Sequence, residues 1–133
     1  MYLLDTDVLS ALRRPERAPR VRAWLGAQDE AALFLSVITL GEIERGIARQ
    51  RNRDPGFADD LQAWLDTTVT VFADRILPFG SDDARIWGRL SAEIGNTSAD
   101  LMIAATGLAT GATVVTGNAR HFEPTGVGVL DPF

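Results

Sequence analysis

The chain begins with Met1 and then Tyr2-Leu3-Leu4-Asp5-Thr6-Asp7, a segment from which the class of fold can be predicted. Three apolar residues followed at once by an acid predict a short buried strand with a polar side chain at its end. A helix is predicted directly afterwards over residues 8–14, with Asp7 as its N-cap and Pro15 as its stop. A buried strand that leads straight into a helix is typical of a parallel α/β sheet.

The same alternation of strand and helix continues along the chain. Short apolar runs predict further strands over residues 33–35, 76–78, 112–115 and 127–130. Helical spacing predicts helices over 21–26, 38–51 and 57–65, one capped by Ser81 or Asp82 that ends at Gly95, and one capped by Ser98. The β-branched stretch 67–72 leaves the end of the third of these helices open. We therefore expect a single α/β domain over residues 1–133, with a central parallel sheet of four to five strands and helices on both faces.

Composition excludes several classes of chemistry in this chain of 133 residues. It contains no cysteine, one histidine (His121) and no lysine, so that all 13 basic residues are arginine. Disulfides, thiolate metal sites and thiol nucleophiles are absent, as are the lysines of phosphate-binding loops and Schiff bases. Carboxylates, hydroxyls and arginines remain for catalysis.

Charge is distributed unevenly along the chain, whose net charge is −5. Residues 1–53 hold nine arginines and seven acids, whereas residues 54–133 hold four arginines and eleven acids. The first part would offer an arginine-rich face to a polyanion, or its arginines simply solvate helix surfaces. The N-terminus carries acids where a signal peptide has basic residues, and no apolar tract is long enough to span a bilayer, so we expect a cytoplasmic protein.

Polar side chains fall where strands end or helices begin. Asp5 follows the first strand, Glu42 lies early in the helix after the second strand, Asp100 lies in the first turn of the buried helix, and Thr116 and Asn118 follow the strand over 112–115. A parallel sheet brings such positions to one edge, where ligands bind. Three carboxylates in a cleft repel one another unless a cation is bound, and oxygen ligands suit Mg²⁺ or Mn²⁺. Such a site supports hydrolysis of a phosphodiester.

Each of these residues also has an ordinary structural explanation. The segment Asp5–Asp7 ends a strand and caps a helix, Glu42 is spaced to pair with Arg45 on its own helix, and Asp100 suits a helix N-terminus. Gly117-Asn118 is common turn chemistry. His121 either contacts phosphate or is structural. The three tryptophans fit apolar helix positions in a core or an interface, at Trp24, Trp64 and Trp87.

The sequence resembles the PIN-domain family, in particular the VapC-type toxins of bacterial toxin–antitoxin pairs. The resemblance runs from end to end, and the order and spacing of its motifs are specific. The matching segments are Leu3-Leu4-Asp5-Thr6-Asp7-Val8-Leu9-Ser10, Ser36-Val37-Ile38-Thr39-Leu40-Gly41-Glu42-Ile43, Ala99-Asp100-Leu101-Met102-Ile103-Ala104-Ala105-Thr106, Val114-Val115-Thr116-Gly117-Asn118-Ala119-Arg120-His121-Phe122 and Gly126-Val127-Gly128-Val129-Leu130-Asp131-Pro132-Phe133.

The resemblance implies a single PIN-like nuclease domain: a metal-dependent endoribonuclease, dimeric and held silent by a small antitoxin. It implies that Asp5, Glu42 and Asp100 bind Mg²⁺ or Mn²⁺, and that Asn118 stands where some members carry a fourth catalytic acid. With the spacing arguments, it leads us to predict RNA contacts for Thr6, Thr116, Arg13, Arg14 and Arg45.

Two positions depart from the family pattern. Asp7 stands where asparagine is common, and Gly117 stands where arginine is frequent. The three-acid set is intact, so these departures bear on substrate affinity more than on chemistry. For the antitoxin, the resemblance implies a groove, and we expect apolar positions in the helices over 8–12 and 57–65 to line it.

Two other functional classes compete with a nuclease. The first is a catalytically silent PIN-like binding module that acts through its partner protein, which Asp7 and Gly117 leave open. Substitution of Asp5 distinguishes it, because a scaffold would keep its behaviour. The second is a receiver-like signalling domain with Asp5 in an acidic Mg²⁺ pocket, against which the absence of lysine argues.

Overall fold

Five short strands form one sheet in the computed structural model, which describes all of residues 1–133. The strands are β1 (Tyr2–Leu4), β2 (Leu33–Ser36), β3 (Ile76–Leu77), β4 (Thr113–Val115) and β5 (Val129–Leu130). Their order in the sheet is β3-β2-β1-β4-β5. All four pairings are parallel, which confirms the predicted architecture.

Helices make every connection between consecutive strands. They are α1 (Thr6–Leu12), α2 (Pro19–Gly26), α3 (Val37–Arg51), α4 (Pro55–Phe72), α5 (Ser81–Ile94), α6 (Ala99–Thr110) and α7 (Ala119–Phe122). Single 3₁₀ turns occur at η1 (Pro15–Arg17), η2 (Glu30–Ala32), η3 (Ala73–Arg75) and η4 (Glu123–Thr125). None of these helices is both long enough and apolar enough to cross a membrane.

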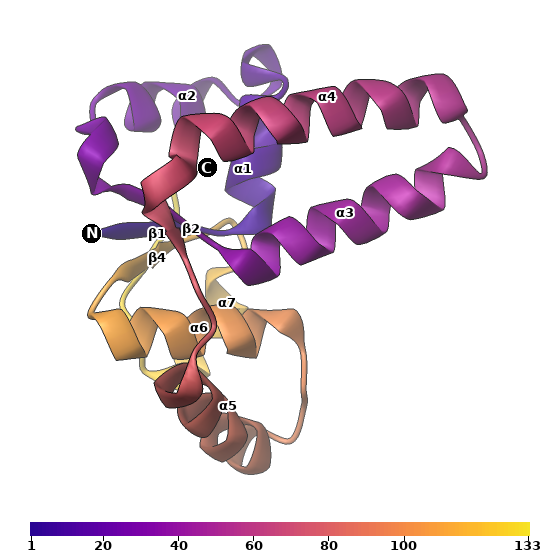
Figure 1. The fold of residues 1–133 in the computed structure, drawn as a ribbon. Coiled ribbons are helices and arrows are strands. Elements are labelled where there is room, and N and C mark those ends of the chain that lie inside the picture. Colours follow the sequence, from indigo (N-terminus) through magenta and orange to yellow (C-terminus); the bar gives the residue numbers. More distant parts are fainter.

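The helices cover the two faces of the sheet in separate groups. In Figure 1, α1 to α4 lie on one side of the sheet and α5 to α7 on the other. Successive strand residues point to opposite faces, so Leu3 and Val114 join the cluster against α5 to α7. Leu4 and Val115 join the cluster against α1, α2 and α4. Each face therefore has its own apolar core.

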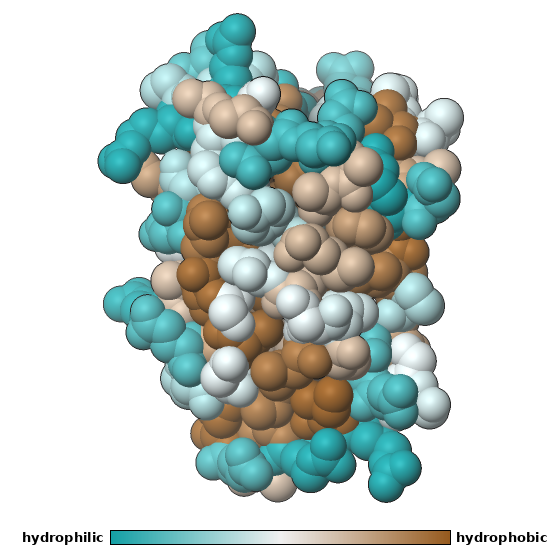
Figure 2. All heavy atoms as spheres, turned by 90° about the vertical axis from the view of Figure 1, so that its left-hand side faces the viewer, coloured by the Kyte–Doolittle hydropathy of each residue, from teal (hydrophilic) through white to brown (hydrophobic).

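Helices α3 and α4 pack side by side and extend past the sheet as an arm (Figure 1). Ile47, Ala58 and Leu65 form a small buried cluster between them. Figure 2 views the side of the molecule where β1 begins, and there hydrophobic atoms gather across the middle and lower part between hydrophilic rims. The carboxyl ends of the strands lie at the opposite edge of the sheet.

Strand order reverses direction at β1. The chain moves from β1 to β2 and β3 on one side, then crosses to β4 and β5 on the other side. After two neighbouring strands, the chain can turn in opposite directions. A crevice then opens at the carboxyl ends of these strands, and ligands of open α/β sheets bind there. In this chain the crevice lies between the ends of β1 and β4, beside Asp5 and Thr116.

Several local predictions were wrong at the helix ends. Asp5, not Asp7, is the N-cap of α1, because the helix begins directly at the end of β1. Gly80, not Ser81 or Asp82, occupies the N-cap of α5. Ser98 is at the predicted N-cap of α6, but its hydroxyl makes no capping hydrogen bond.

Two helical segments exceed what the sequence predicts. Helix α4 continues through the β-branched residues to Phe72, which buries its ring in the core. Thr68 and Thr70 donate hydrogen bonds from their hydroxyls to the carbonyls four residues earlier, which suits them to a helix. The four-residue helix α7 after Asn118 has no apolar period that would have revealed it.

Candidate functional site

Asp5 is the central side chain of the polar cluster at the crevice. It follows β1 and caps α1, so its backbone is fixed from both directions. Its Oδ1 accepts a hydrogen bond from the Thr6 backbone N–H at 2.8 Å, and its Oδ2 accepts one from the Thr116 hydroxyl at 2.8 Å. Asp5 is only 3% exposed, so an ionised carboxylate here is largely removed from water.

Glu42 reaches the cluster from α3. Ser36 caps this helix at the end of β2, which places Glu42 in the second turn above the sheet edge. The Thr6 hydroxyl donates to Glu42 Oε1 at 2.6 Å. Thr6 therefore holds both acids, Asp5 through its backbone and Glu42 through its side chain.

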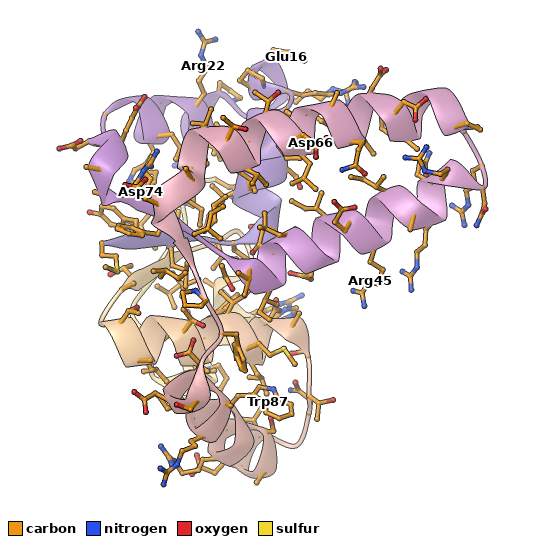
Figure 3. All side chains as sticks on the ribbon, in the orientation of Figure 1. Glu16, Arg22, Arg45, Asp66, Asp74 and Trp87 are labelled. Atoms are coloured by element: carbon orange, nitrogen blue, oxygen red, sulfur yellow. The ribbon has the colours of Figure 1, made fainter.

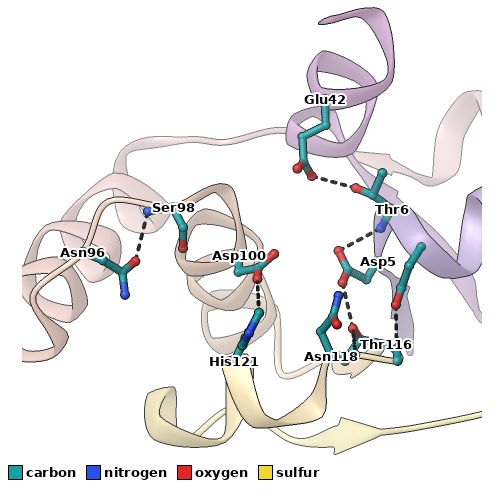
Figure 4. A network of polar contacts seen from close by, with 11 residues as sticks. Asp5, Thr6, Glu42, Asn96, Ser98, Asp100, Thr116, Asn118 and His121 are labelled. Carbon is teal, nitrogen blue, oxygen red and sulfur yellow. Dashed lines mark hydrogen bonds and ion pairs between the residues drawn. The ribbon is translucent and has the colours of Figure 1, made fainter. Parts of the chain in front are cut away.

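Asp100 approaches from the opposite side, in the first turn of α6. Its Oδ2 lies 3.1 Å from His121 Nδ1, on α7. In Figure 4, the carboxylates of Asp5, Glu42 and Asp100 face a common space, with Asn118 below it. Three elements far apart in the sequence thus bring the three predicted acids to one edge of the sheet.

Burial disfavours the ionised form of Asp5. The pKa of Asp5 is raised from 3.8 to about 6, chiefly by loss of solvation, while the negative charges of Asp7 and Asp100 also raise it and its two hydrogen bonds lower it. The pKa of Asp7 is raised as well, again chiefly by burial. At neutral pH, the ionised carboxylates of this site are therefore poorly stabilised by the surrounding protein.

Asp7 ties α1 to the segment after β4. Its Oδ2 accepts a hydrogen bond from the Gly117 backbone N–H at 2.8 Å, while its buried Oδ1 has no partner. A Cβ at position 117 would stand 2.8 Å from Asp7 Oδ2 and 2.9 Å from the Phe133 ring. Glycine is thus required by close approach, and the two departures from the family pattern, Asp7 and Gly117, form one local arrangement.

The donor set fits a hard divalent cation in its chemistry. No three Asp, Glu or His side chains converge closely enough to enclose a metal ion. However, Asp5 is poorly solvated and the nearby acid Asp100 adds to the cost of ionising it. A bound cation would relieve both penalties, and carboxylate oxygens are the ligands that Mg²⁺ and Mn²⁺ prefer.

The other predicted site residues divide into two groups. Thr116 is fully buried and also accepts a hydrogen bond from the Asn118 backbone N–H at 2.9 Å, while the Asn118 side chain is exposed. Arg45 lines a hollow that also includes Glu42. It projects from the α3 side that faces α6 (Figure 3). Arg14 caps η1 and lines neither this hollow nor the groove described next.

A groove between α1, α3 and α4 opens toward the acids. It has a volume of about 340 Å³ and reaches Thr6 and Glu42 at one end. Arg13 lies in it with its guanidinium 5.2 Å from the centre of the Phe57 ring. Its apolar wall is formed by Ile43, Ile47, Phe57, Leu61 and Trp64.

The groove agrees only in part with the prediction. The residues over 57–65 supply Phe57, Leu61 and Trp64, as expected. Val8 and Leu9 do not line it, because both are fully buried against the sheet. Helix α1 contributes the polar side chains of Ser10 and Arg13 instead.

His121 is the residue at this edge that sequence reasoning did not place. A single histidine beside a phenylalanine gives no pattern, and the short helix that carries it was not predicted. The available signal was its position three residues after Asn118, one helical turn beyond a segment already expected at the sheet edge. The structure brings its Nδ1 to Asp100.

Comparisons with known proteins agree with this fold. The family model for the PIN domain matches residues 2–126. The VapC ribonuclease Y4jK of Sinorhizobium fredii is 34% identical over 140 residues, and the match covers 100% of this chain and 98% of Y4jK. The FitAcB crystal structure from Neisseria gonorrhoeae superposes with a TM-score of 0.86 at 33% identity, covering 99% of this chain and 98% of that one. VapBC-5 from Mycobacterium tuberculosis, of the VapBC family of toxin–antitoxin systems, gives a TM-score of 0.57 at 27% identity over 97% and 94% of the two chains.

Proposed function

The chain belongs to the PIN-domain family, and we propose that it is the toxin of a toxin–antitoxin pair, an endoribonuclease that depends on Mg²⁺ or Mn²⁺. The observation that carries the proposal is that the carboxylates of Asp5, Glu42 and Asp100 face a common space at the carboxyl edge of the sheet (Figure 4). The ribonuclease name of a relative that matches the whole chain supports it.

Asp5, Glu42 and Asp100 are the residues that would hold the ion. A divalent cation supplies Lewis-acid activation of water and offsets charge on the leaving oxygen of a phosphodiester. The proposed reaction is hydrolysis, in which a water oxygen bonds to phosphorus, the P–O bond to the leaving nucleotide breaks, and that oxygen takes up a proton. The chain has no cysteine thiolate to bind a metal ion, and the charged side chains at this edge that can donate oxygen to one are carboxylates.

The hydroxyls around the acids fix their orientation. Thr116 holds Asp5 Oδ2, and Thr6 holds Glu42 Oε1, so each acid keeps lone pairs directed at the common space. Asn118 donates its backbone N–H to Thr116 and keeps its side-chain amide available for a phosphate or a water molecule. Preorganised acids of this kind lower the cost of assembling the site during the reaction.

Arginines at two sides of the acids would bind the RNA backbone. Arg13 lies in the groove that reaches Thr6 and Glu42, and Arg45 lines the hollow on the other side of Glu42. Each neutralised phosphate adds affinity that falls with salt. Arg14 lines neither the groove nor the hollow, so we assign no phosphate contact to it.

The groove between α1, α3 and α4 is the proposed antitoxin site. It combines an apolar wall with direct access to Glu42, so an apolar helix or strand of the partner seated there would also cover the acids. The membership of VapBC-5 in a toxin–antitoxin family supports a partner of this kind. By the same resemblance, we expect the chain to act as a homodimer within that assembly.

The test is cleavage of a mixed RNA pool by the purified, partner-free protein in Mn²⁺. We expect the wild-type protein and an Asp60→Asn variant, changed at an exposed acid on α4, to cut RNA equally. Asp5→Asn, which removes the buried acid, should abolish cutting. Equal cutting by Asp5→Asn would contradict the proposal. No cutting by folded wild-type protein would favour the silent binding module.

A further inference from the structure

A hollow of about 450 Å³ adjoins the acids on the far side of Asp100. It lies between the loop that joins α5 to α6 and the segment from α7 to η4. Ile94 and Pro124 give it apolar walls, while Asn96, Arg120 and His121 add polar groups. Its volume is within the range of small-molecule sites, which combine apolar surface with a few polar groups.

Asp100 belongs to both this hollow and the acidic site. Figure 4 shows the pair Asp100 and His121 between Asn96 on one side and Asp5 on the other. A strand of RNA whose phosphate lies at the acids would therefore place a neighbouring nucleotide in the hollow.

The polar groups of the hollow keep hydrogen-bonding capacity that is not used within the protein. Arg120 takes part in none of the ion pairs or side-chain hydrogen bonds of the structure, unlike Arg51, which pairs with Asp59. Asn96 accepts a hydrogen bond at Oδ1 from the Ser98 backbone N–H, which leaves its amide donors available.

The contact with Asp100 decides what His121 offers to a ligand. A carboxylate oxygen only accepts hydrogen bonds, so the contact at 3.1 Å places the imidazole proton on Nδ1. In the neutral ring Nε2 then carries a lone pair and accepts a hydrogen bond. Asp100 thereby fixes the ring orientation and leaves an acceptor on the side chain, which is 52% exposed.

We propose that this hollow is an RNA-selective nucleotide subsite, in which Arg120 binds a phosphate and His121 Nε2 accepts a hydrogen bond from a ribose 2′-hydroxyl. Ile94 and Pro124 contact the base or sugar, and Asn96 donates to a base edge. The 2′-hydroxyl is the group that distinguishes RNA from DNA at a single position. This inference rests on the proposed nuclease function, because it assumes that RNA crosses the acids.

The test measures binding in an Asp5→Asn background, so that the RNA stays intact. The probes are a short single-stranded oligoribonucleotide and its deoxyribose counterpart, in Mg²⁺. His121 is the sole histidine, so the imidazole NMR signals can be assigned to it directly. We expect the RNA to shift these signals more strongly than the deoxyribose strand, which lacks the 2′-hydroxyl.

Two replacements of His121 separate sugar binding from support of Asp100. His121→Gln keeps an amide near the position of Nε2, and His121→Asn keeps an amide near Nδ1, beside Asp100. We expect the preference for RNA over DNA to survive in the Gln variant and to fall roughly fivefold to tenfold in the Asn variant, the effect of one hydrogen bond.

Arg120→Ala tests the phosphate contact. We expect it to weaken binding of both strands equally and to reduce the slope of log affinity against log salt by about 0.7. The matched control is Arg89→Ala, which removes an exposed arginine of α5 that lines a different hollow. This variant should leave the affinity and the salt slope unchanged.

Two outcomes overturn the subsite. If RNA binds while the His121 signals stay in place, or if the Asn variant keeps the full preference for RNA, the hollow is not the sugar site, and the nuclease proposal stands. If neither strand binds at all, the subsite fails, and the cleavage assay on the wild-type protein decides the nuclease proposal separately.

Discussion

The Asp5 carboxylate lies at the end of β1 with two hydrogen bonds and almost no exposure to water. Burial raises its pKa to about 6, so at neutral pH the metal-free fold holds an ionised group that it solvates poorly. A bound cation removes that penalty. At this residue the stability of the metal-free protein and the proposed function therefore oppose each other, as is common at functional sites.

Asp5→Asn should stabilise the metal-free protein above pH 6. Because the pKa of Asp5 is raised from 3.8 to about 6, the folded state binds more protons than the unfolded state in this interval, and stability falls as pH rises through it. The asparagine variant escapes this loss, which amounts to at most about 3 kcal/mol. We expect thermal unfolding in a chelator to show the variant more stable at pH 8 and the difference to vanish below pH 4.

Asp60→Asn, at an exposed position on α4, is the control for the charge change alone. If it stabilised the protein as much as Asp5→Asn, the gain would come from the acidic net charge of the whole chain. An Asp5→Asn variant that loses stability at pH 8 would contradict the raised pKa.

Thr116→Val should lower both stability and RNA cleavage. The valine side chain has the same shape but lacks the hydroxyl that donates to Asp5 and accepts from the Asn118 backbone N–H. Leaving these buried groups without partners costs about 1–3 kcal/mol. The measurement is denaturant unfolding beside a cleavage assay, with Thr70→Val as the control, because the Thr70 hydroxyl only bonds its own helix at an exposed position. Equal losses in both variants would contradict the role of Thr116.

At the scale of elements, the packing of α6 on the sheet depends on Gly107. A Cβ there would stand 2.8 Å from Val127 Cγ2 and 3.2 Å from Val114 Cγ2, both on buried β-branched side chains. Because Asp100 is carried by the first turn of this helix, the packing also sets the position of one acid of the site.

Gly107→Ala should destabilise the protein by about 1–3 kcal/mol, the cost of overpacking, in spite of the better helix propensity of alanine. Gly88→Ala on α5 is the matched control, because no atom lies within 4 Å of its would-be Cβ. At position 88 only the higher helix propensity of alanine changes the free energy of unfolding, so we expect a stabilisation of up to about 1 kcal/mol. Chemical denaturation measures both, and a stabilised Gly107→Ala variant would contradict the tight packing of α6.

The sequence predicted the order of strands and helices well, because the apolar runs are short and separated by clear helical spacing. Its errors lie where tertiary contacts override local preference. Helix α4 reaches Phe72 because that ring is buried in the core. Asp7 does not cap α1 because its carboxylate instead accepts the Gly117 N–H, a contact between positions 110 residues apart.

The candidate site was predicted to a similar extent. Asp5, Glu42 and Asp100 were expected at one sheet edge from their places after strands and at helix starts, and they do lie together there. Their individual partners could not be predicted, since Thr6 with Glu42 and His121 with Asp100 are contacts across the fold. The predicted RNA contact of Arg14 stays a prediction, since this residue lines neither the groove nor the hollow beside Glu42.

In the whole molecule, the arm of α3 and α4 links the groove between α1, α3 and α4 to the acids. Glu42 lies on α3 near the sheet, and the same helix carries Ile43 and Ile47 into the groove. A protein segment seated in the groove would therefore lie beside an acid of the site.

Leu61→Arg should prevent neutralisation by the antitoxin while RNA cleavage by the isolated protein continues. Leu61 lines the groove from α4, and a charged side chain there would be buried by a bound apolar segment without a counterion. The measurement is inhibition of cleavage by the product of the adjacent reading frame. Asp66→Arg, at an exposed position of the same helix that is outside the groove, is the control. Full inhibition of the Leu61 variant would place the partner elsewhere.

If the acids at the sheet edge form a metal-dependent ribonuclease, removal of the metal must stop RNA cleavage. The measurement is the rate at which the purified protein cleaves a fluorescent single-stranded RNA before chelation, after chelation, and after Mn²⁺ is added back. We expect cleavage to stop on chelation and to return with Mn²⁺. Cleavage that continues unchanged in the chelator would show that the acids do not act through a metal ion.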